Sequence, residues 1–181
     1  MNFTSFMNTL TKMDVSSKII ESVTTKDTLG RVLRLQLVAE QLVESWVCGA
    51  TNSESIFGTN DTRVLIEASK KIEIANNLNL PIEISNILKK LNKLRNDFAH
   101  NHSINGIPDN IIASMEANLA NRLGGNMVSL KNTYIDVDYN GDGNISRIVY
   151  SDNETTNDSK LSIITLCAMR LLIESAQSIA K

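Results

Sequence analysis

The segment 91–100, LNKLRNDFAH, places an arginine, an asparagine and a histidine within one helical stretch. A guanidinium holds a phosphate or a carboxylate through two parallel hydrogen bonds. An imidazole is the side chain that exchanges a proton most readily near neutral pH. Arg95, Asn96 and His100 are therefore the candidate catalytic residues. Arg95 would stabilise charge, His100 would carry a proton, and Asn96 would orient the phosphate or the imidazole.

The spacing of these residues predicts where they lie on a helix. At about 100° per residue, the helix has two adjacent stripes. The first holds Leu88, Leu91, Arg95 and Phe98, and the second holds Lys89, Lys93, Asn96 and His100. Arg95 is thus expected to interrupt an apolar face. There it needs a carboxylate, a carbonyl, a subunit interface or a phosphate, because an unpaired buried charge is expensive.

The rest of the chain is dominated by helical periodicity. A long helix is predicted from residue 27 to about residue 50, followed by helices over 61–80, 81–100, 108–125 and 157–181. The first has an apolar stripe of Val32, Leu35, Ala39, Leu42 and Trp46 and a polar stripe of Asp27, Arg31, Arg34, Gln41 and Ser45. The buried positions expected in the others are Leu65, Ala68, Ile72, Ala75, Ile84, Leu161, Ile164, Ala168, Leu171 and Leu172. Residues 1–25 predict one or two short helices.

One segment, 133–150, follows a different period. Polar Asp136 and Asp138 alternate with apolar neighbours before an Asn-Gly turn, and alternation resumes after it. This pattern predicts a β-hairpin. The stretch Asp138 to Ser146 also resembles a calcium-binding loop, but the position that should supply a bidentate carboxylate is Val149. A structural turn and a weak calcium site both remain open.

Composition limits the classes of protein that the chain can represent. Its 181 residues suit a single domain, and its net charge of −2 gives no global positive field to attract nucleic acid. Cys48 and Cys167 lack metal-ligand spacing and read as reduced residues of a cytoplasmic protein. No metal, cofactor, signal peptide or membrane span is predicted, because the most apolar window is about 13 residues and contains Arg170. Lys70, Lys71 and Lys90 are expected on solvated faces, and Trp46 and Phe98 in the core or an interface.

The residues RNDFAH, with the motif R-N-x-x-x-H, resemble the signature of the HEPN superfamily. The longer stretch 71–101, KIEIANNLNLPIEISNILKKLNKLRNDFAHN, and the preceding GRVLRLQLVAEQLVESW are similar to the mannitol operon repressor-like branch of that superfamily. The resemblance covers about residues 27–101 and extends to the last helix. It implies an all-α, HEPN-type bundle of five to seven helices in one domain, 1–181, with the hairpin as an insertion.

The resemblance also implies a homodimer in which the arginine and histidine of both subunits line one cleft. In active HEPN proteins such a cleft cuts RNA without metal. Lys89 and Lys93 would attract RNA, together with His102, which stands where the best-known toxin subgroup has a tyrosine. An endoribonuclease or RNA-binding protein of a toxin–antitoxin or defence system is one expectation, with an antitoxin as a further partner.

Two other interpretations stay open. The repressor-like branch keeps the same motif although its members are described as regulators, so the chain is alternatively a non-catalytic transcriptional regulator that acts through protein partners. No helix-turn-helix signature supports direct DNA binding. The motif can also be purely structural, since an arginine or histidine near a helix C-terminus bonds the last carbonyls and suits the helix dipole.

Overall fold

The computed structural model describes residues 1–12, 14–58, 64–100, 106–122, 128–139 and 141–180. Within these residues the chain forms seven helices of nine residues or more, one helical turn and a two-stranded antiparallel sheet. The helices are α1 (Phe3–Thr11), α2 (Val15–Thr24), α3 (Thr28–Thr51), α4 (Ala68–Asn77), α5 (Ile82–His100), α6 (Asp109–Arg122) and α8 (Asn157–Ala180). The single turn is α7 (Val128–Lys131), and the strands are β1 (Tyr134–Asp138) and β2 (Ile145–Val149). The predicted helical bundle with one hairpin is confirmed.

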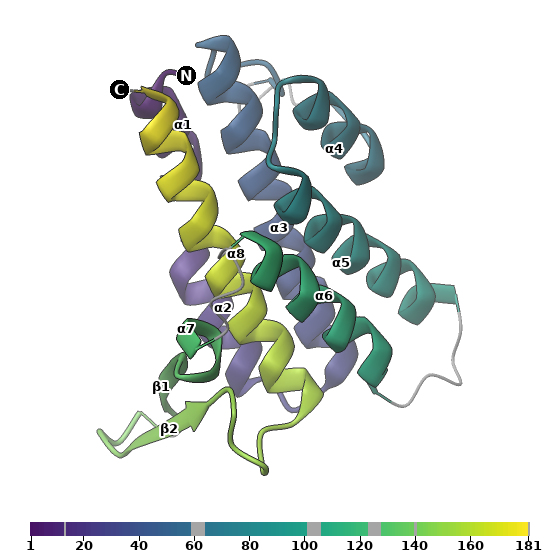
Figure 1. The fold of residues 1–181 in the computed structure, drawn as a ribbon, viewed down its shortest axis with the longest axis vertical. Coiled ribbons are helices and arrows are strands. Elements are labelled where there is room, and N and C mark those ends of the chain that lie inside the picture. Colours follow the sequence, from purple (N-terminus) through teal and green to yellow (C-terminus); the bar gives the residue numbers. More distant parts are fainter. Residues whose placement is uncertain (13, 59–63, 101–105, 123–127, 140, 181) are drawn as a thin grey trace.

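Helix α3 is the central element of the bundle. It packs against α1, α2, α4, α5 and α8, and Figure 1 shows it running between α8 on one side and α5 on the other. Its predicted apolar stripe is fully buried, with Trp46 at its far end. The prediction of one polar face was wrong, because Arg31, Gln41 and Ser45 are buried as well. A helix surrounded on several sides must bury polar positions and supply partners for them: Gln41 donates to the Thr9 carbonyl.

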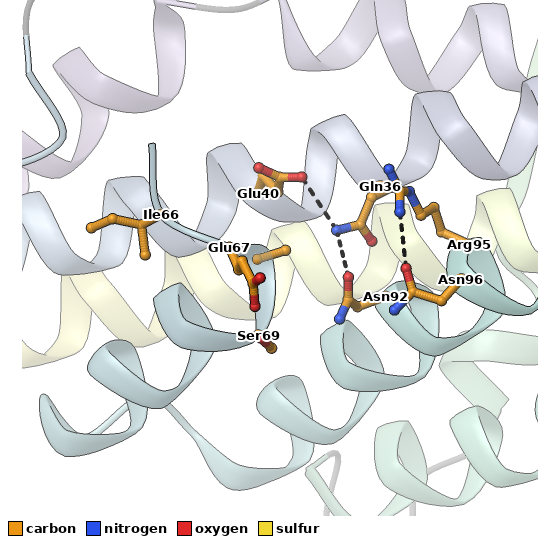
Figure 2. A pocket seen from close by; sticks show the side chains of 9 residues that line it. Gln36, Glu40, Ile66, Glu67, Ser69, Asn92, Arg95 and Asn96 are labelled. Atoms are coloured by element: carbon orange, nitrogen blue, oxygen red, sulfur yellow. Dashed lines mark hydrogen bonds between the residues drawn. The ribbon is translucent and has the colours of Figure 1, made fainter. Parts of the chain in front are cut away.

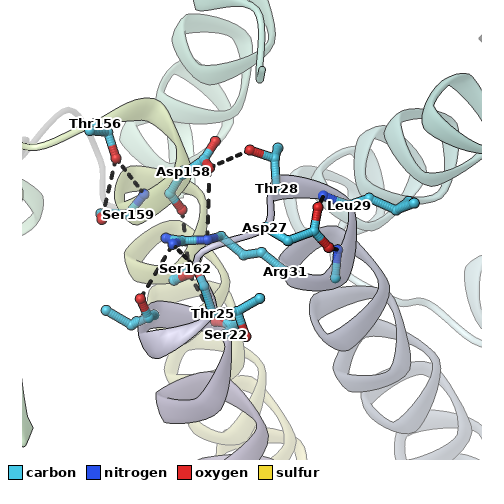
Figure 3. A network of polar contacts seen from close by, with 12 residues as sticks. Ser22, Thr25, Asp27, Thr28, Leu29, Arg31, Thr156, Asp158, Ser159 and Ser162 are labelled. Atoms are coloured by element: carbon cyan, nitrogen blue, oxygen red, sulfur yellow. Dashed lines mark hydrogen bonds and ion pairs between the residues drawn. The ribbon is translucent and has the colours of Figure 1, made fainter. Parts of the chain in front are cut away.

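Arg31 joins α2, α3 and α8 at one end of the bundle (Figure 3). Its guanidinium donates to the carbonyls of Val23, at 3.3 Å, and Thr25, at 2.7 Å, and its Nε lies 4.0 Å from an Asp158 carboxylate oxygen. Thr28 donates to the same carboxylate at 2.6 Å. Burial lowers the pKa of Arg31, and the charge of Asp158 opposes that shift. The start of α8 is therefore fixed to the start of α3.

Helix α4 begins later than its sequence pattern predicts. The helix was expected from residue 61, with Leu65 buried, but it starts at Ala68, and Leu65 is 95% exposed. The backbone N–H of Val64 donates to the Phe57 carbonyl at 3.1 Å, so this segment pairs with the preceding turn and does not extend the helix. The expected burial of Ile72 and Ala75 is confirmed.

The remaining helices follow their predicted positions closely. Helix α5 begins directly after Pro81, and α6 ends at Arg122, while the double glycine expected to stop α6 lies outside the described residues. The predicted core positions of α8 are buried, except Leu171, which is half-buried.

The apolar part of helix α8 is longer than the 13-residue window recognised in the sequence. Among the described residues it alone has the length and composition of a membrane-crossing helix. In the structure it packs against α2, α3 and α6 and contributes Leu161, Ile164 and Leu172 to the core. A core helix of a bundle meets the same length and composition test.

The β-hairpin predicted over 133–150 is confirmed. Tyr134 pairs with Val149 and Asp138 with Ile145. The Asp138 carboxylate accepts the backbone N–H groups of Gly141, at 2.7 Å, and Gly143, at 2.8 Å, and both glycines have positive φ. The Asp138 carboxylate thus holds the backbone of the loop. Asn140 lies outside the described residues.

Tyr150, just after β2, attaches the hairpin to α6. Its ring is 4% exposed, and its hydroxyl donates to Glu116 at 2.5 Å. Burial raises the pKa of this phenol strongly, and the hydrogen bond to the negative Glu116 raises it further. The folded chain therefore keeps Tyr150 protonated at pH values where an exposed tyrosine ionises.

This difference predicts a stability that falls at high pH. Above the ordinary tyrosine pKa of 10.0 the unfolded chain loses a proton that the folded chain keeps, so the free energy of unfolding decreases as pH rises. Below that value the contribution is constant. Tyr150→Phe removes the titrating group, so wild type should lose up to about 1.4 kcal/mol per pH unit more than the variant. Urea unfolding of both chains on either side of that pKa measures the two slopes, and equal slopes would contradict the assignment.

Candidate functional site

The three candidate catalytic residues lie at the C-terminal end of α5. Arg95 and His100 are exposed, and Asn96 is half-buried. The Arg95 guanidinium donates to the Asn96 side-chain oxygen at 3.0 Å, which brings these two side chains together. The expectation that Arg95 interrupts a buried apolar face was wrong for the single chain. Phe98, on the same predicted stripe, is 9% exposed and belongs to the core.

The late start of α4 explains the exposure of Arg95. The first residues of α4, Ala68 and Ser69, line a pocket together with Asn92, Arg95 and Asn96 of α5. Past this point α4 no longer covers the surface that α5 shares with α3. The corresponding position one turn earlier on α5 is buried, whereas Arg95 is open to solvent.

The basic residues near the motif divide into two groups. Lys89 and Lys93, the predicted RNA-binding lysines, are exposed on α5, and Lys70 is exposed on α4. Lys71 was also expected on a solvated face, but it is 4% exposed. Its Nζ lies 2.6 Å from Glu44 and 3.1 Å from Glu40, because α4 packs this position directly onto α3. His102 lies outside the described residues.

The pocket beside Arg95 has a volume of about 400 Å³ and a mainly polar lining. Figure 2 shows side chains from α3, α5 and the start of α4 turned toward it. Its polar lining includes Gln36, Glu40, Glu67, Asn92, Arg95 and Asn96. The Gln36 side-chain nitrogen lies 3.4 Å from an oxygen of Glu40 and 3.4 Å from the Asn92 oxygen. The pocket is thus formed by three helices that meet next to the motif.

Sequence reasoning missed Gln36, Glu40 and Asn92. Asn92, Asn96 and His100 recur at four-residue spacing, which places them on one face of α5. That spacing was a usable signal for Asn92. Gln36 and Glu40 also share a helical face, but only the tertiary packing shows that this face meets α5.

A stripe of exposed leucines lies on the same side of α3 as Gln36 and Glu40. Leu29, Leu33 and Leu37 are 37%, 41% and 47% exposed and follow one another at four-residue spacing. By helical geometry this leucine stripe continues the face that α4 covers farther along α3. The uncovered half of that face therefore presents apolar surface next to the polar pocket.

The described residues contain no group of three or more His, Cys, Asp or Glu side chains arranged to hold a metal ion. The chain matches no protein-family model, no curated protein and no solved structure.

Proposed function

We propose that the chain is a HEPN-type endoribonuclease that cuts RNA without a metal ion and acts as a homodimer. The observation that carries the proposal is the exposure of Arg95 and His100 at the same end of α5, with the guanidinium held by Asn96 at 3.0 Å. Arg95 and His100 are therefore open to a ligand. A cytoplasmic toxin–antitoxin or defence role belongs to the same proposal.

The proposed reaction is an in-line transesterification at an RNA phosphate. The ribose 2′-oxygen attacks phosphorus and gives up its proton, and the bond from phosphorus to the 5′-oxygen breaks. The 5′-oxygen takes a proton, so the products are a 2′,3′-cyclic phosphate and a free 5′-hydroxyl. His100 carries a proton in this scheme, and Arg95 stabilises the charge that develops on the phosphoryl oxygens. Lys89 and Lys93 attract the RNA backbone.

A dimer supplies this reaction with two copies of each group. One step needs a base and another needs an acid, and two copies of His100 in one cleft provide both roles. The leucine stripe of Leu29, Leu33 and Leu37 offers apolar surface close to the pocket that Arg95 lines. Contact between the stripes of two chains would bury leucine side chains, which favours association, and would place the interface close to the pocket that Arg95 lines in each chain.

The dimer is tested by its mass. Wild type should have the mass of two chains in light scattering at micromolar concentration. The double variant Leu33→Ser with Leu37→Ser should weaken association at least a hundredfold, since each buried leucine contributes roughly 1.5–3 kcal/mol. Ile145→Ser on the hairpin removes an apolar side chain that is more exposed than either leucine and lies away from the stripe, and it should leave the mass unchanged. A wild-type mass of one chain would refute the dimer.

The activity is tested with purified protein and mixed RNA in EDTA. Fragments that carry 2′,3′-cyclic phosphate and 5′-hydroxyl ends are expected. If RNA stays intact, the second candidate function replaces the first: a non-catalytic regulator that binds a protein partner. The leucine stripe is the observation that supports this alternative, because an exposed apolar stripe beside polar residues also suits an interface with a different protein.

A further inference from the structure

The pocket beside Arg95 contains a buried side chain whose hydrogen bonding is incomplete. Gln36 is 5% exposed, and within the described part of the chain its side-chain oxygen has no hydrogen-bond partner. Its nitrogen has two long contacts with described residues, both at 3.4 Å. A buried amide oxygen left without a donor costs about 1–3 kcal/mol. A ligand that brings a donor to this oxygen would recover that free energy.

The other groups of the pocket indicate the chemistry of the ligand. Asn92 and Asn96 each present an amide donor, while their oxygens already accept from Gln36 and Arg95. Glu40 and Glu67 present carboxylate acceptors. Arg95 is the one cation among the described lining residues, so the lining as a whole carries a net negative charge. A free phosphate is therefore disfavoured inside the pocket. A neutral ring with several N–H donors and ring acceptors fits this lining.

We propose that the pocket binds one nucleobase of the RNA, while Arg95 at its edge holds the adjacent phosphate. The inference rests on the proposed function, which assigns a phosphate to Arg95. Amide side chains read base edges through paired donor and acceptor contacts, and carboxylates accept from exocyclic amino groups. Two carboxylates in the lining favour a base that carries an exocyclic amino group. Adenine, cytosine and guanine have such a group and uracil does not.

The volume agrees with this assignment. About 400 Å³ lies within the range of small-ligand pockets and leaves room for a base with its ribose. Cleavage would then occur preferentially next to nucleotides whose base carries an amino group. This preference would come from the pocket, because Arg95 and His100 do not distinguish one base from another.

The first experiment is an equilibrium titration in EDTA with AMP, CMP, GMP, UMP and ribose 5-phosphate. At least one of AMP, CMP and GMP should bind roughly tenfold more tightly than both UMP and ribose 5-phosphate. Ribose 5-phosphate reports the phosphate contact without a base. Equal binding of all five probes, or binding of none, would overturn the inference.

Two variants locate the effect in the pocket. Asn92→Ala removes an amide from the lining and should abolish the tenfold preference. Asn86→Ala is the matched control, because Asn86 is also a half-buried asparagine of α5 but bonds Asn118 on α6. The control should keep the preference. If Asn92→Ala does not fold, Asn92→Asp replaces the amide with a carboxylate of similar shape and should change the order of affinities. An unchanged order in the folded Asn92 variant would refute the assignment.

Comparison of the mononucleotide titration with the RNA cleavage assay separates this inference from the proposed function. If RNA is cut but the four mononucleotides bind alike, the nuclease proposal stands and the pocket assignment fails. If a mononucleotide binds with base preference while RNA stays intact, the pocket assignment stands and the nuclease proposal fails.

Discussion

An RNA that wild type cuts in EDTA is expected to be cut about 10²–10⁴-fold more slowly by His100→Ala, because the variant lacks the proton carrier. His100 is exposed at the end of α5, so its loss should leave the core intact. The thermal unfolding of the variant should match that of wild type. Rates are measured by single-turnover cleavage of one labelled RNA with each protein in excess.

Substitution of Arg95 should also slow cleavage, because this side chain is proposed to contact the phosphate. Arg95→Ala should lose at least as much rate as His100→Ala if the guanidinium contacts the developing charge. Arg95→Lys keeps the positive charge but loses the paired hydrogen bonds, so its rate should fall between wild type and Arg95→Ala. Arg147→Ala, which removes an exposed arginine of the hairpin, serves as the control and should cut at the wild-type rate.

The oligomeric state of each variant must be measured beside its rate, since Arg95 also lies near the leucine stripe. A variant that is dimeric and slow supports the catalytic role. A His100→Ala dimer that cuts RNA as fast as wild type would eliminate the proposed reaction, and the regulator would then be the better candidate.

Lys71→Ala is expected to cost about 3–5 kcal/mol of folding free energy, because it removes the buried cation that pairs with Glu44 and Glu40. Glu44 has a side chain only 10% exposed, at 2.6 Å from the Lys71 nitrogen. Glu40 is 29% exposed and can regain water, which places the cost toward the lower end of that range. The Lys71 nitrogen also lies 5.7 Å from the centre of the Phe57 ring, so the variant loses a cation–π contact as well.

Lys70→Ala is a closely matched control for this prediction. Lys70 is the preceding residue of the same helix, and its side chain is 62% exposed in a pair with Glu73. Exposed pairs of this kind contribute at most about 1 kcal/mol. Urea unfolding of the three chains compares the free energies directly. Similar values for both variants would mean that the Lys71 contacts do not stabilise the fold.

Local patterns were sufficient to predict most of the architecture. The boundaries of α5, the buried stripe of α3 and the position of the hairpin depend on neighbouring residues in the chain, and the sequence encodes them through period and turn chemistry. The burial of Arg31 and Lys71 could not be predicted in this way. Their partners, Asp158 and Glu44, are distant in sequence, and only the packing of α8 and α4 onto α3 brings them together.

The candidate site shows the same division. The motif residues Arg95, Asn96 and His100 were identified from their types and spacing. The exposure of Arg95 depends on where α4 begins, and a hydrogen bond between Val64 and Phe57 accompanies that start. The periodicity of the sequence predicts that this helix begins at residue 61. A helix of that length would cover the surface beside Arg95 that α4 leaves open.

The position of α8 has a consequence for the order in which the chain folds. Helices α1, α2 and α3 are consecutive, and α1 and α2 each pack on α3, so these contacts close shorter loops than the contact with α8 does. The contact of α8 with α3 requires closure of the loop formed by residues 52–156, and the entropy cost grows with loop length. We therefore expect α1–α3 to form an early folding nucleus and the docking of α8, fixed by Arg31 and Asp158, to be the late step.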